Sequence, residues 1–351
     1  MPPRAGLIDS LIYGASQAVR VGWFMGQYRA AQSLAPRLPA SRWPKPGTTA
    51  PGLGRALMAD LRALLRRDWA NIRAGLYKAP HDMLPSPAAA LRQALRFFAD
   101  LPAVNLRRRE RRNSDVMEQA SRGGYPRYYL QNFHYQTDGY LSERSAALYD
   151  YQVEVLFLGG ADAMRRQALP VLRRHLADRP SDQAGARLLD VACGTGRFLG
   201  FVKDNFPDLR TTGLDLSPAY LKEAARGLRR WGGAELVHAN AETMPFADAS
   251  FDAATCVYLF HELPRAVRER VTREIARVLK PGGLLVLVDS LQRGDVPRYD
   301  ALLDRFPVSF HEPYYADYVG QDLGALFAAA GLTPGQSDVA FLSKIAVATR
   351  R

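Results

Sequence analysis

Residues 188–196 read LLDVACGTG, an apolar run that ends in a turn of small side chains. The run predicts a buried strand, which we place at residues 186–191. Ala192, Gly194 and Gly196 are small enough for a tight turn and for close approach of a ligand to the backbone. In an open α/β sheet, ligands bind at the carboxyl ends of the strands. The pattern therefore predicts a ligand-binding loop directly after the first strand of such a sheet.

Short apolar runs and helical segments alternate downstream of this loop. Strands are expected at 211–214, 234–239, 251–257 and 283–289, and helices at 196–206, 218–231, 265–279 and 319–330. Such alternation is typical of an α/β fold with a parallel, doubly wound sheet and helices on both faces. Two apolar runs at 338–342 and 344–349 lie close together and predict an antiparallel end to the sheet.

The predicted second strand ends at Asp215. An acid at this position can accept hydrogen bonds from both ribose hydroxyls of an adenosine. A nicotinamide dinucleotide would also require the fingerprint GxGxxG, with the helix N-terminus facing the pyrophosphate and a glycine at the last position. Here that position is Leu199. The sequence thus indicates an adenosine cofactor without phosphates.

Four segments, in order and with compatible gaps, resemble motifs of the class I S-adenosylmethionine-dependent methyltransferases. They are DVACGTG (190–196), GLDLS (213–217), NAETMPF (240–246) and RVLKPGG (277–283). The resemblance covers about residues 145–351 and is strongest to the group that includes the quinone C-methyltransferases. It implies a Rossmann-like, seven-stranded sheet with an antiparallel last strand, and S-adenosylmethionine as the cofactor.

The resemblance also implies roles for individual residues around the cofactor. Asp190 would hold the amino-acid end of the cofactor, while Ala192, Gly194 and Gly196 would shape the loop. Ala192 stands where the family usually has glycine. Asp215 would bind the ribose, and Leu216 would pack on the adenine.

The third motif begins with Asn240 and Ala241, where the family commonly has Asp-Ala facing the adenine edge. Asparagine keeps an acceptor but loses the charge, so we expect altered affinity. Tyr258, grouped here with the cofactor residues, opens the segment 258–264, which by the resemblance lines the junction of cofactor and acceptor. His261 is the candidate general base because imidazole titrates near neutral pH, and a structural role is the alternative.

A second cluster at 310–318 occupies the region that caps the acceptor in similar enzymes. His311, Tyr314 and Tyr315 are the candidates for acceptor binding. The cluster repeats a His-Glu pair that also occurs at 261–262. Because adjacent side chains diverge on a strand or helix, no shared metal site is expected.

Nine aromatic or His residues crowd into positions 125–151, interleaved with polar side chains. This composition predicts a pocket wall or lid, and a packed aromatic cluster that bridges two parts of the chain is the alternative. The resemblance implies that Tyr149 lies over the cofactor. His134 and Tyr135 are expected to join this lid.

The charge is distributed unevenly along the 351 residues. Residues 1–125 hold 20 Lys/Arg against 8 Asp/Glu, whereas the remainder is electrically neutral. We therefore expect a basic helical N-terminal extension over 1–121 with a linker at about 35–52 and a helix at 86–99. An aromatic connecting segment over 122–160 and a methyltransferase domain over 161–351 should follow. A neutral domain argues against a nucleic-acid partner.

The pattern of the N-terminal segment predicts an amphipathic helix. Charged residues interrupt its apolar runs too often for a membrane-spanning helix. It could dock on its own protein, or residues 1–34 and 107–112 could contact an anionic membrane. For the run 107–112, a solvated charged face or loop is the other interpretation. Only two cysteines occur, Cys193 and Cys256, which fits a cytoplasmic protein with reduced thiols.

We predict an S-adenosylmethionine-dependent methyltransferase with a small hydrophobic or aromatic acceptor, such as a quinone precursor, lipid or pigment. Methylation of RNA or protein is one alternative, which the charge surplus favours and the lack of an NPPY-type tetrapeptide after Val257 disfavours. A non-catalytic cofactor-binding scaffold is another, and the intact glycines and Asp215 argue against it.

Overall fold

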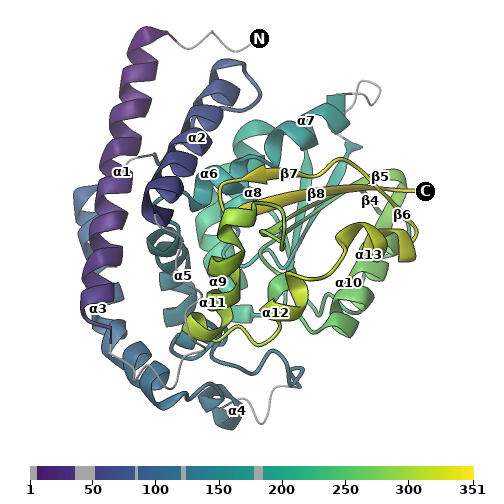
Figure 1. Cartoon of the computed structure of the whole chain (residues 1–351). Helices are drawn as coiled ribbons and strands as arrows, with labels where there is room; N and C mark the ends of the chain where they lie inside the picture. The colour runs from purple at the N-terminus through teal and green to yellow at the C-terminus, as the bar shows by residue number, and fades with distance from the viewer. Residues whose placement is uncertain (1–5, 36–51, 84–85, 120–123, 178–184) are drawn as a thin grey trace.

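The computed structural model describes residues 6–35, 52–83, 86–119, 124–177 and 185–351, so nearly all of the predicted linker at 35–52 lies outside the described residues. A single sheet forms the centre of the molecule (Figure 1). Its strands are β1 (Arg187–Val191), β2 (Arg210–Asp215), β3 (Glu235–His238), β4 (Phe251–Val257), β5 (Leu279–Ser290), β6 (Leu332–Pro334), β7 (Asp338–Ala340) and β8 (Ser343–Arg350). Their order is β3-β2-β1-β4-β5-β8-β6, with β7 paired to β8.

The first five strands are parallel, and β8 runs antiparallel to β5. The order reverses between β1 and β4, which places a switch point at the carboxyl end of β1. The predicted seven-stranded path with an antiparallel last strand is confirmed. The two strands expected at 338–342 and 344–349 are β7 and β8, which pair antiparallel, whereas sequence reasoning missed the three-residue strand β6.

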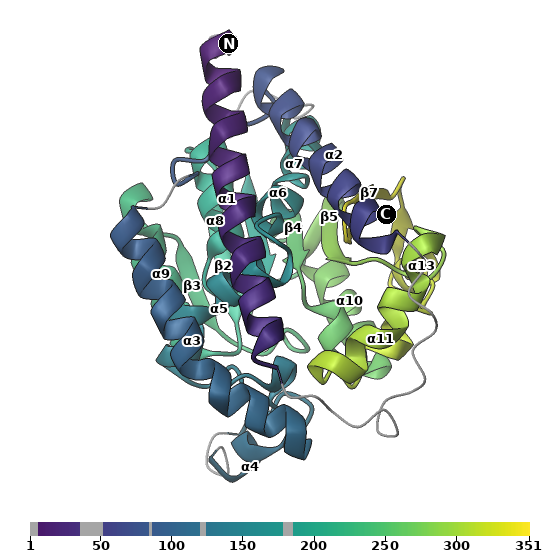
Figure 2. The ribbon, with the colours of Figure 1, turned by 60° about the vertical axis from the view of Figure 1, so that its left-hand side comes forward.

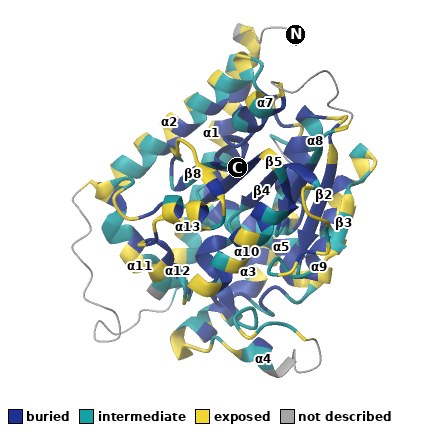
Figure 3. Cartoon of the chain, turned by 90° about the vertical axis from the view of Figure 1, so that its right-hand side faces the viewer, coloured by how far each residue is buried: buried dark blue, intermediate teal, exposed yellow. Residues whose placement is uncertain are grey.

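Both faces of the sheet are buried, as Figure 3 shows by the dark blue strands. Along β5, Leu285 and Leu287 enter one apolar core, while Leu284, Val286 and Val288 enter the other. Successive side chains of a strand point to opposite faces, so a continuous apolar run suits a sheet covered on both sides. This is why the Leu/Val-rich sequence at 283–289 identified a central strand.

The α-helices are α1 (Leu7–Ser33), α2 (Leu53–Arg73), α3 (Pro87–Glu110), α4 (Asp115–Gln119), α5 (Glu143–Leu156), α6 (Ala161–Arg166), α7 (Leu169–Ala177), α8 (Arg197–Asn205), α9 (Pro218–Gly227), α10 (Arg265–Val278), α11 (Asp300–Phe310), α12 (Tyr315–Tyr318) and α13 (Leu323–Ala329). Short 3-10 turns are η2 (Phe133–Tyr135), η4 (Leu228–Trp231), η5 (Phe260–Glu262) and η6 (Pro297–Tyr299). Helices α10 to α13 pack on one face of the sheet, and α2 and α6 to α9 pack on the other.

Two predicted helices have different bounds in the structure. The helix expected at 319–330 is shorter and begins later, as α13, because the Asp322 side chain caps its start by accepting from the Ala325 N–H. The helix expected at 86–99 extends to Glu110 as α3. The first residue of the basic run 107–112, Arg107, is therefore buried, and its Nε donates to the Tyr135 carbonyl at 2.9 Å.

Helices α1, α3 and α5 pack together on the outside of the sheet-bearing core (Figure 2). Their shared core includes Phe24, Phe97, Leu148 and Tyr151. Among the described residues, no helix combines the length and the apolar composition that a membrane span requires.

Candidate active site

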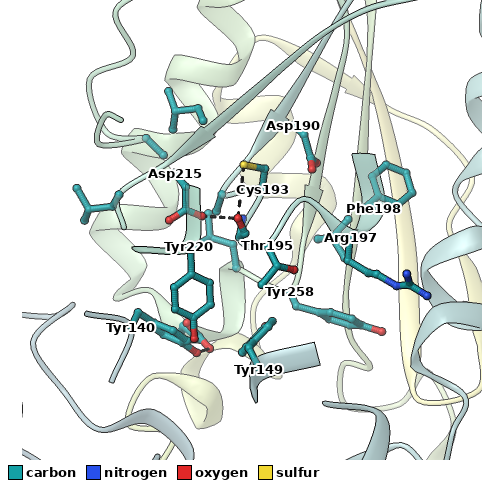
Figure 4. A pocket seen from close by; sticks show the side chains of 18 of the residues that line it. Tyr140, Tyr149, Asp190, Cys193, Thr195, Arg197, Phe198, Asp215, Tyr220 and Tyr258 are labelled. Carbon is teal, nitrogen blue, oxygen red and sulfur yellow. Dashed lines mark hydrogen bonds between the residues drawn. The ribbon is translucent and has the colours of Figure 1, made fainter. Parts of the chain in front are cut away.

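A cavity of about 970 Å³ lies at the carboxyl ends of β1, β2 and β4. Its lining comes from the loop after β1, the ends of β2 and β4, and the aromatic segment before α5 (Figure 4). Of the cofactor residues expected from the sequence, it brings together Asp190, Ala192, Gly194, Asp215, Leu216, Asn240, Ala241 and Tyr258. Gly196 does not line this cavity.

The loop after β1 contains residues with left-handed backbone conformations. Ala192 and Gly194 have left-handed φ angles of 56° and 54°. A non-glycine residue pays about 1 kcal/mol or more for this conformation, so Ala192 is a strained position. Gly196, at φ 73°, begins α8, and a Cβ there would lie 3.1 Å from Ala224 Cβ. Gly196 thus serves helix packing rather than ligand contact.

Two buried carboxylates flank this loop. The Asp215 oxygens accept from the Gly194 and Ser217 backbone N–H groups, each at 2.8 Å. Burial raises the pKa of Asp215, and these hydrogen bonds oppose the rise. Asp190 accepts from the Thr255 hydroxyl at 2.6 Å, and burial raises its pKa to about 7. A cationic ligand beside Asp190 would favour its charged form.

The lining fits S-adenosylmethionine better than a dinucleotide. Asp190 and Asp215 offer acceptors to a cation and to ribose hydroxyls, and they do so from the two strands that the sequence indicated. The two arginines of the cavity, Arg165 and Arg197, are already paired with Asp162 at 3.0 and 2.5 Å. Since a pyrophosphate would need free cations or a glycine-rich cradle, the donor set suits an uncharged adenosine end.

Two predicted cofactor residues have their polar groups engaged elsewhere. The Asn240 side-chain oxygen accepts from the Glu242 N–H at 2.9 Å, so it supports the loop as well as lining the cavity. The Tyr258 hydroxyl lies 2.8 Å from Ser343 Oγ. The ring of Tyr258 lines the cavity, but its hydroxyl is tied to β8.

The aromatic segment closes the cavity from the side opposite β1 and β2. Tyr128, Tyr129, Tyr140 and Tyr149 all line it. Tyr128 donates to Glu242 Oε1 at 2.6 Å, and the Tyr140 carbonyl accepts from Ser217 Oγ at 2.6 Å. The sequence left open whether this segment is a pocket wall or a packed aromatic cluster. It is both, since Tyr140 lines the cavity and also packs on Phe133.

Of the three residues expected in a lid, Tyr149 and His134 line cavities and Tyr135 does not. Their function as a lid stays a prediction.

His261 and Glu262 are neighbours in different surroundings, and of the two only Glu262 lines the cofactor cavity. His261 Nδ1 lies 2.6 Å from Asp289 Oδ1, whose other oxygen accepts from the Phe260 N–H. Burial alone would lower the pKa of His261, but Asp289 raises it to about 10. Glu262 accepts from the Tyr140 hydroxyl, and burial raises its pKa to about 7.

The His261 ring therefore keeps its proton at neutral pH and is not a free base in this state. The expectation that His261 is the general base stays a prediction. The pKa of Glu262, by contrast, matches neutral pH.

A second cavity of about 1120 Å³ adjoins the first. The two share Tyr149, Tyr258 and Glu262. The lining of the second cavity is largely apolar and comes from α5, α11 and the segments after β4 and β7. Tyr315 lines it, as the sequence analysis expected of an acceptor residue.

For His311, acceptor binding stays a prediction. Its ring nitrogens lie 3.2 Å from Asn113 Nδ2 and 2.9 Å from Gln131 Oε1. It lines neither the cofactor cavity nor the cavity beside it. His311 therefore connects α11 to the aromatic segment. Tyr314 likewise accepts from Gln131 Nε2 at 2.9 Å.

Glu262 and Glu312, the glutamates of the two His-Glu pairs, lie close together, and the third residue beside them is His134. The possible ligand atoms of His134, Glu262 and Glu312 lie within 4.8 Å of one another. Burial lowers the pKa of His134 to about 3 and raises the pKa of Glu312 well above its ordinary value, so burial disfavours the charged form of both side chains. The expectation that no metal binds here stays a prediction.

Comparison with known families agrees with this geometry. Residues 188–283, from β1 to the start of the apolar half of β5, match the family model of a methyltransferase domain. This segment thus has the sequence pattern of a methyltransferase domain. It contains Asp190, Asp215 and Glu262, whereas the aromatic wall of the cofactor cavity lies outside the matched residues.

Relatives match the methyltransferase domain over part of their length. A fatty-acid O-methyltransferase of Mycolicibacterium smegmatis is 31% identical over 151 residues, which is 43% of this chain and 53% of that protein. A demethylmenaquinone methyltransferase of Lysinibacillus sphaericus is 30% identical, over 44% of this chain and 60% of that protein. The chain thus spans little more than half the length of these curated relatives.

Among solved structures, the fold is similar to that of an S-adenosylmethionine-dependent methyltransferase from Aquifex aeolicus. The identity is 19%, the TM-score is 0.39, and the similarity covers 52% of this chain and 88% of that one.

Sequence reasoning missed three groups around the methyltransferase site. Glu262 was noticed only as one half of a pair, and neither Tyr140 nor Asp289 was singled out. Asp289 ends the apolar run of β5, where a charge on a buried strand could have signalled a function. The approach of Tyr140 to Glu262 had no sequence signal, because 122 positions separate the two residues.

Proposed function

We propose that this protein transfers the methyl group of S-adenosylmethionine to a hydrophobic acceptor. The observation that carries the proposal is the junction of the two cavities. A cavity with two acids and a glycine loop opens, beside Tyr149, Tyr258 and Glu262, into a larger and mainly apolar one. Ligand sites of enzymes are mostly apolar with a few convergent polar groups, which matches this arrangement.

Asp215 and Asp190 would hold the ribose and the cationic amino-acid end of the cofactor, and Leu216 would pack on the adenine. When bound, S-adenosylmethionine supplies an electrophilic methyl group. The aromatic wall of Tyr129, Tyr140 and Tyr149 excludes water and fixes the direction from which an acceptor approaches. Alignment of this kind accounts for much of the rate in a displacement reaction.

Glu262 is the group that we assign to take up the acceptor's proton. Its side chain faces both cavities, and its pKa of about 7 suits a base at neutral pH. The neighbouring His261 holds its proton against Asp289, so it contributes positive charge beside the acceptor. Such a charge would stabilise an enolate or phenolate that forms when the proton leaves.

The names of two relatives support a lipid or quinone acceptor, since one is a fatty-acid O-methyltransferase and the other a demethylmenaquinone methyltransferase. A cytoplasmic location accompanies the proposal. Cys193 and Cys256 are both buried free thiols, which suits a reducing compartment.

Calorimetric titration with S-adenosylhomocysteine and with NADH tests the cofactor. We expect S-adenosylhomocysteine alone to bind, with at least about tenfold weaker affinity for Asp215→Ala, because hydrogen bonds to a charged group contribute about 1.5–3 kcal/mol. Labelled methyl transfer to lipid, quinone, RNA and protein fractions then tests the acceptor. Transfer to RNA or protein alone would overturn the hydrophobic acceptor, and cofactor binding without any transfer would indicate a scaffold.

A further inference from the structure

Helix α1 is attached to the rest of the protein through polar side chains. The Tyr13 hydroxyl donates to Asp68 Oδ2 at 2.6 Å, and Arg20 Nη2 donates to Asp162 Oδ2 at 3.0 Å. Ser16 and Gln17 are buried on the same face. The spacing of these residues places them on one side of the helix, and that side faces the protein.

The opposite side of α1 is apolar and exposed. Its large side chains are between 37% and 73% exposed, and they are Ile8, Leu11, Ile12, Val19 and Trp23. Their spacing also corresponds to one face of the helix. An ordinary surface helix turns its apolar side to the core and its polar side to water. Helix α1 buries Phe24 on its inner side, yet five large apolar side chains remain on its outer side, so that side suits apolar surroundings.

Helix α3 carries a similar exposed row. Leu91, Leu95 and Leu106 are between 41% and 63% exposed and lie on one side of the helix. Asn105 Nδ2 donates to the Leu34 carbonyl at 3.0 Å, which ties α3 to the residue after α1. Both helices lie on the side of the molecule that faces the viewer in Figure 2. The eight exposed side chains of the two helices are called the α1–α3 face below.

Basic residues accompany this face. Arg29 is exposed near the end of α1, and Arg92, Arg96 and Arg109 are exposed on α3. This arrangement of apolar side chains and arginines matches a protein that inserts apolar groups into a bilayer while its cations contact anionic headgroups.

A third cavity, of about 840 Å³, lies between α1, α3 and α5. Tyr28 and Ala31 of α1 and Leu101 and Val104 of α3 line it. It shares six lining residues with the apolar cavity beside the cofactor, which are Tyr28, His134, Tyr149, Val153, Leu156 and Phe310. The helices that carry the exposed apolar rows therefore also form the wall of a space that continues to the methyltransferase site.

We propose that the α1–α3 face docks on the surface of an anionic phospholipid membrane. The cavity between α1 and α3 then admits a membrane-dissolved acceptor to the site, and this second part rests on the proposed function. A lipid surface explains the arginines better than a second copy of the chain does. In a two-fold symmetric pair the same patch faces itself, so this face would bring like charges together.

Vesicle flotation tests the docking without reference to methyl transfer. The full-length protein is mixed with vesicles of phosphatidylcholine, with or without phosphatidylglycerol. We expect the protein to float with the anionic vesicles, less so at high salt, and to remain largely unbound with the neutral ones.

Leu11→Ser and Leu95→Ser should each weaken binding to anionic vesicles by about tenfold, because burial of a leucine contributes about 1.5–3 kcal/mol. Leu11→Glu should weaken it further. Gln336→Glu is the matched control, since it adds the same charge at an exposed position outside this face and should change binding little.

Three results would overturn the docking proposal. These are no flotation of the wild-type protein, equal flotation of the leucine variants, and a dimer in sedimentation that Leu11→Ser dissociates while vesicle binding persists. Titration with S-adenosylhomocysteine accompanies every variant and shows that it is folded. Loss of docking with cofactor binding intact would therefore be distinct from failure of the proposed function.

Discussion

At the scale of single residues, different surroundings give the neighbours His261 and Glu262 different pKa values. His261 and Glu262 share one 3-10 turn, yet Asp289 keeps the histidine protonated while burial keeps the pKa of the glutamate near neutrality. The histidine contacts an acid at the end of β5, and the glutamate contacts a hydroxyl from the aromatic segment. Identity of the side chain therefore did not decide which residue can accept a proton.

We expect Glu262→Gln to slow methyl transfer by about 100-fold, the usual contribution of a general base. The wild-type rate should rise with pH through about 7, because only the ionised carboxylate accepts a proton. The variant should lack this rise, because an amide does not titrate. Rates measured from pH 5 to 9 with a saturating acceptor check the prediction.

Glu274→Gln is the control, since this acid bonds Arg277 away from the cavities, and it should retain the pH dependence. If the rise near pH 7 persists in Glu262→Gln, another residue is the base.

At the scale of elements, one buried acid joins the N-terminal helices to the core. Asp68 of α2 accepts from Tyr13 of α1 and pairs with Arg166 of α6 at 2.6 Å. It also accepts from Tyr77 at 2.7 Å. All of these contacts are buried, so Asp68 fixes the position of α1 and α2 against the methyltransferase domain.

Asp68→Ala should lower the free energy of unfolding by about 3–5 kcal/mol, because Arg166 would remain as a buried cation without its partner. Urea denaturation followed by circular dichroism measures the change. In contrast, Glu143→Ala breaks an exposed pair with Lys222 and should leave the midpoint nearly unchanged. Equal effects of the two substitutions would show that the Asp68 cluster does not anchor the helices.

At the scale of the whole molecule, three cavities meet at one side chain. Tyr149 lines the cofactor cavity, the apolar cavity beside it and the cavity between α1 and α3. The N-terminal helices thus complete the space in which an acceptor would bind, although they lie outside the residues that match the methyltransferase family model.

Val153→Trp should fill the space shared by the second and third cavities, because Val153 lines both. We expect at least about tenfold less methyl transfer at low acceptor concentration, since displaced apolar contacts of about 1.5–3 kcal/mol are lost. Affinity for S-adenosylhomocysteine should not change, because Val153 does not line the cofactor cavity. Val153→Ala, which only enlarges the space, serves as the control. Full transfer by the tryptophan variant would place the acceptor elsewhere.

The sequence by itself determined the sheet and most of the cofactor cavity. These features depend on local patterns, such as apolar runs, the turn at 192–196 and the acid at the end of β2, and each pattern is confined to a few neighbouring residues. The helix bounds were less certain because the Asp322 cap and the continuation of α3 compete with periodicity.

Only the tertiary structure shows that His261 pairs with Asp289, that Glu262 lines both cavities and that His311 lies outside them. Each depends on a partner distant in the chain, namely Asp289, Tyr140 and Gln131. The exposure of the apolar outer side of α1 was equally hidden, because the periodicity of the helix is the same whichever face meets the protein. Burial and pairing are properties of the folded chain, and they assign the chemistry that residue types leave open.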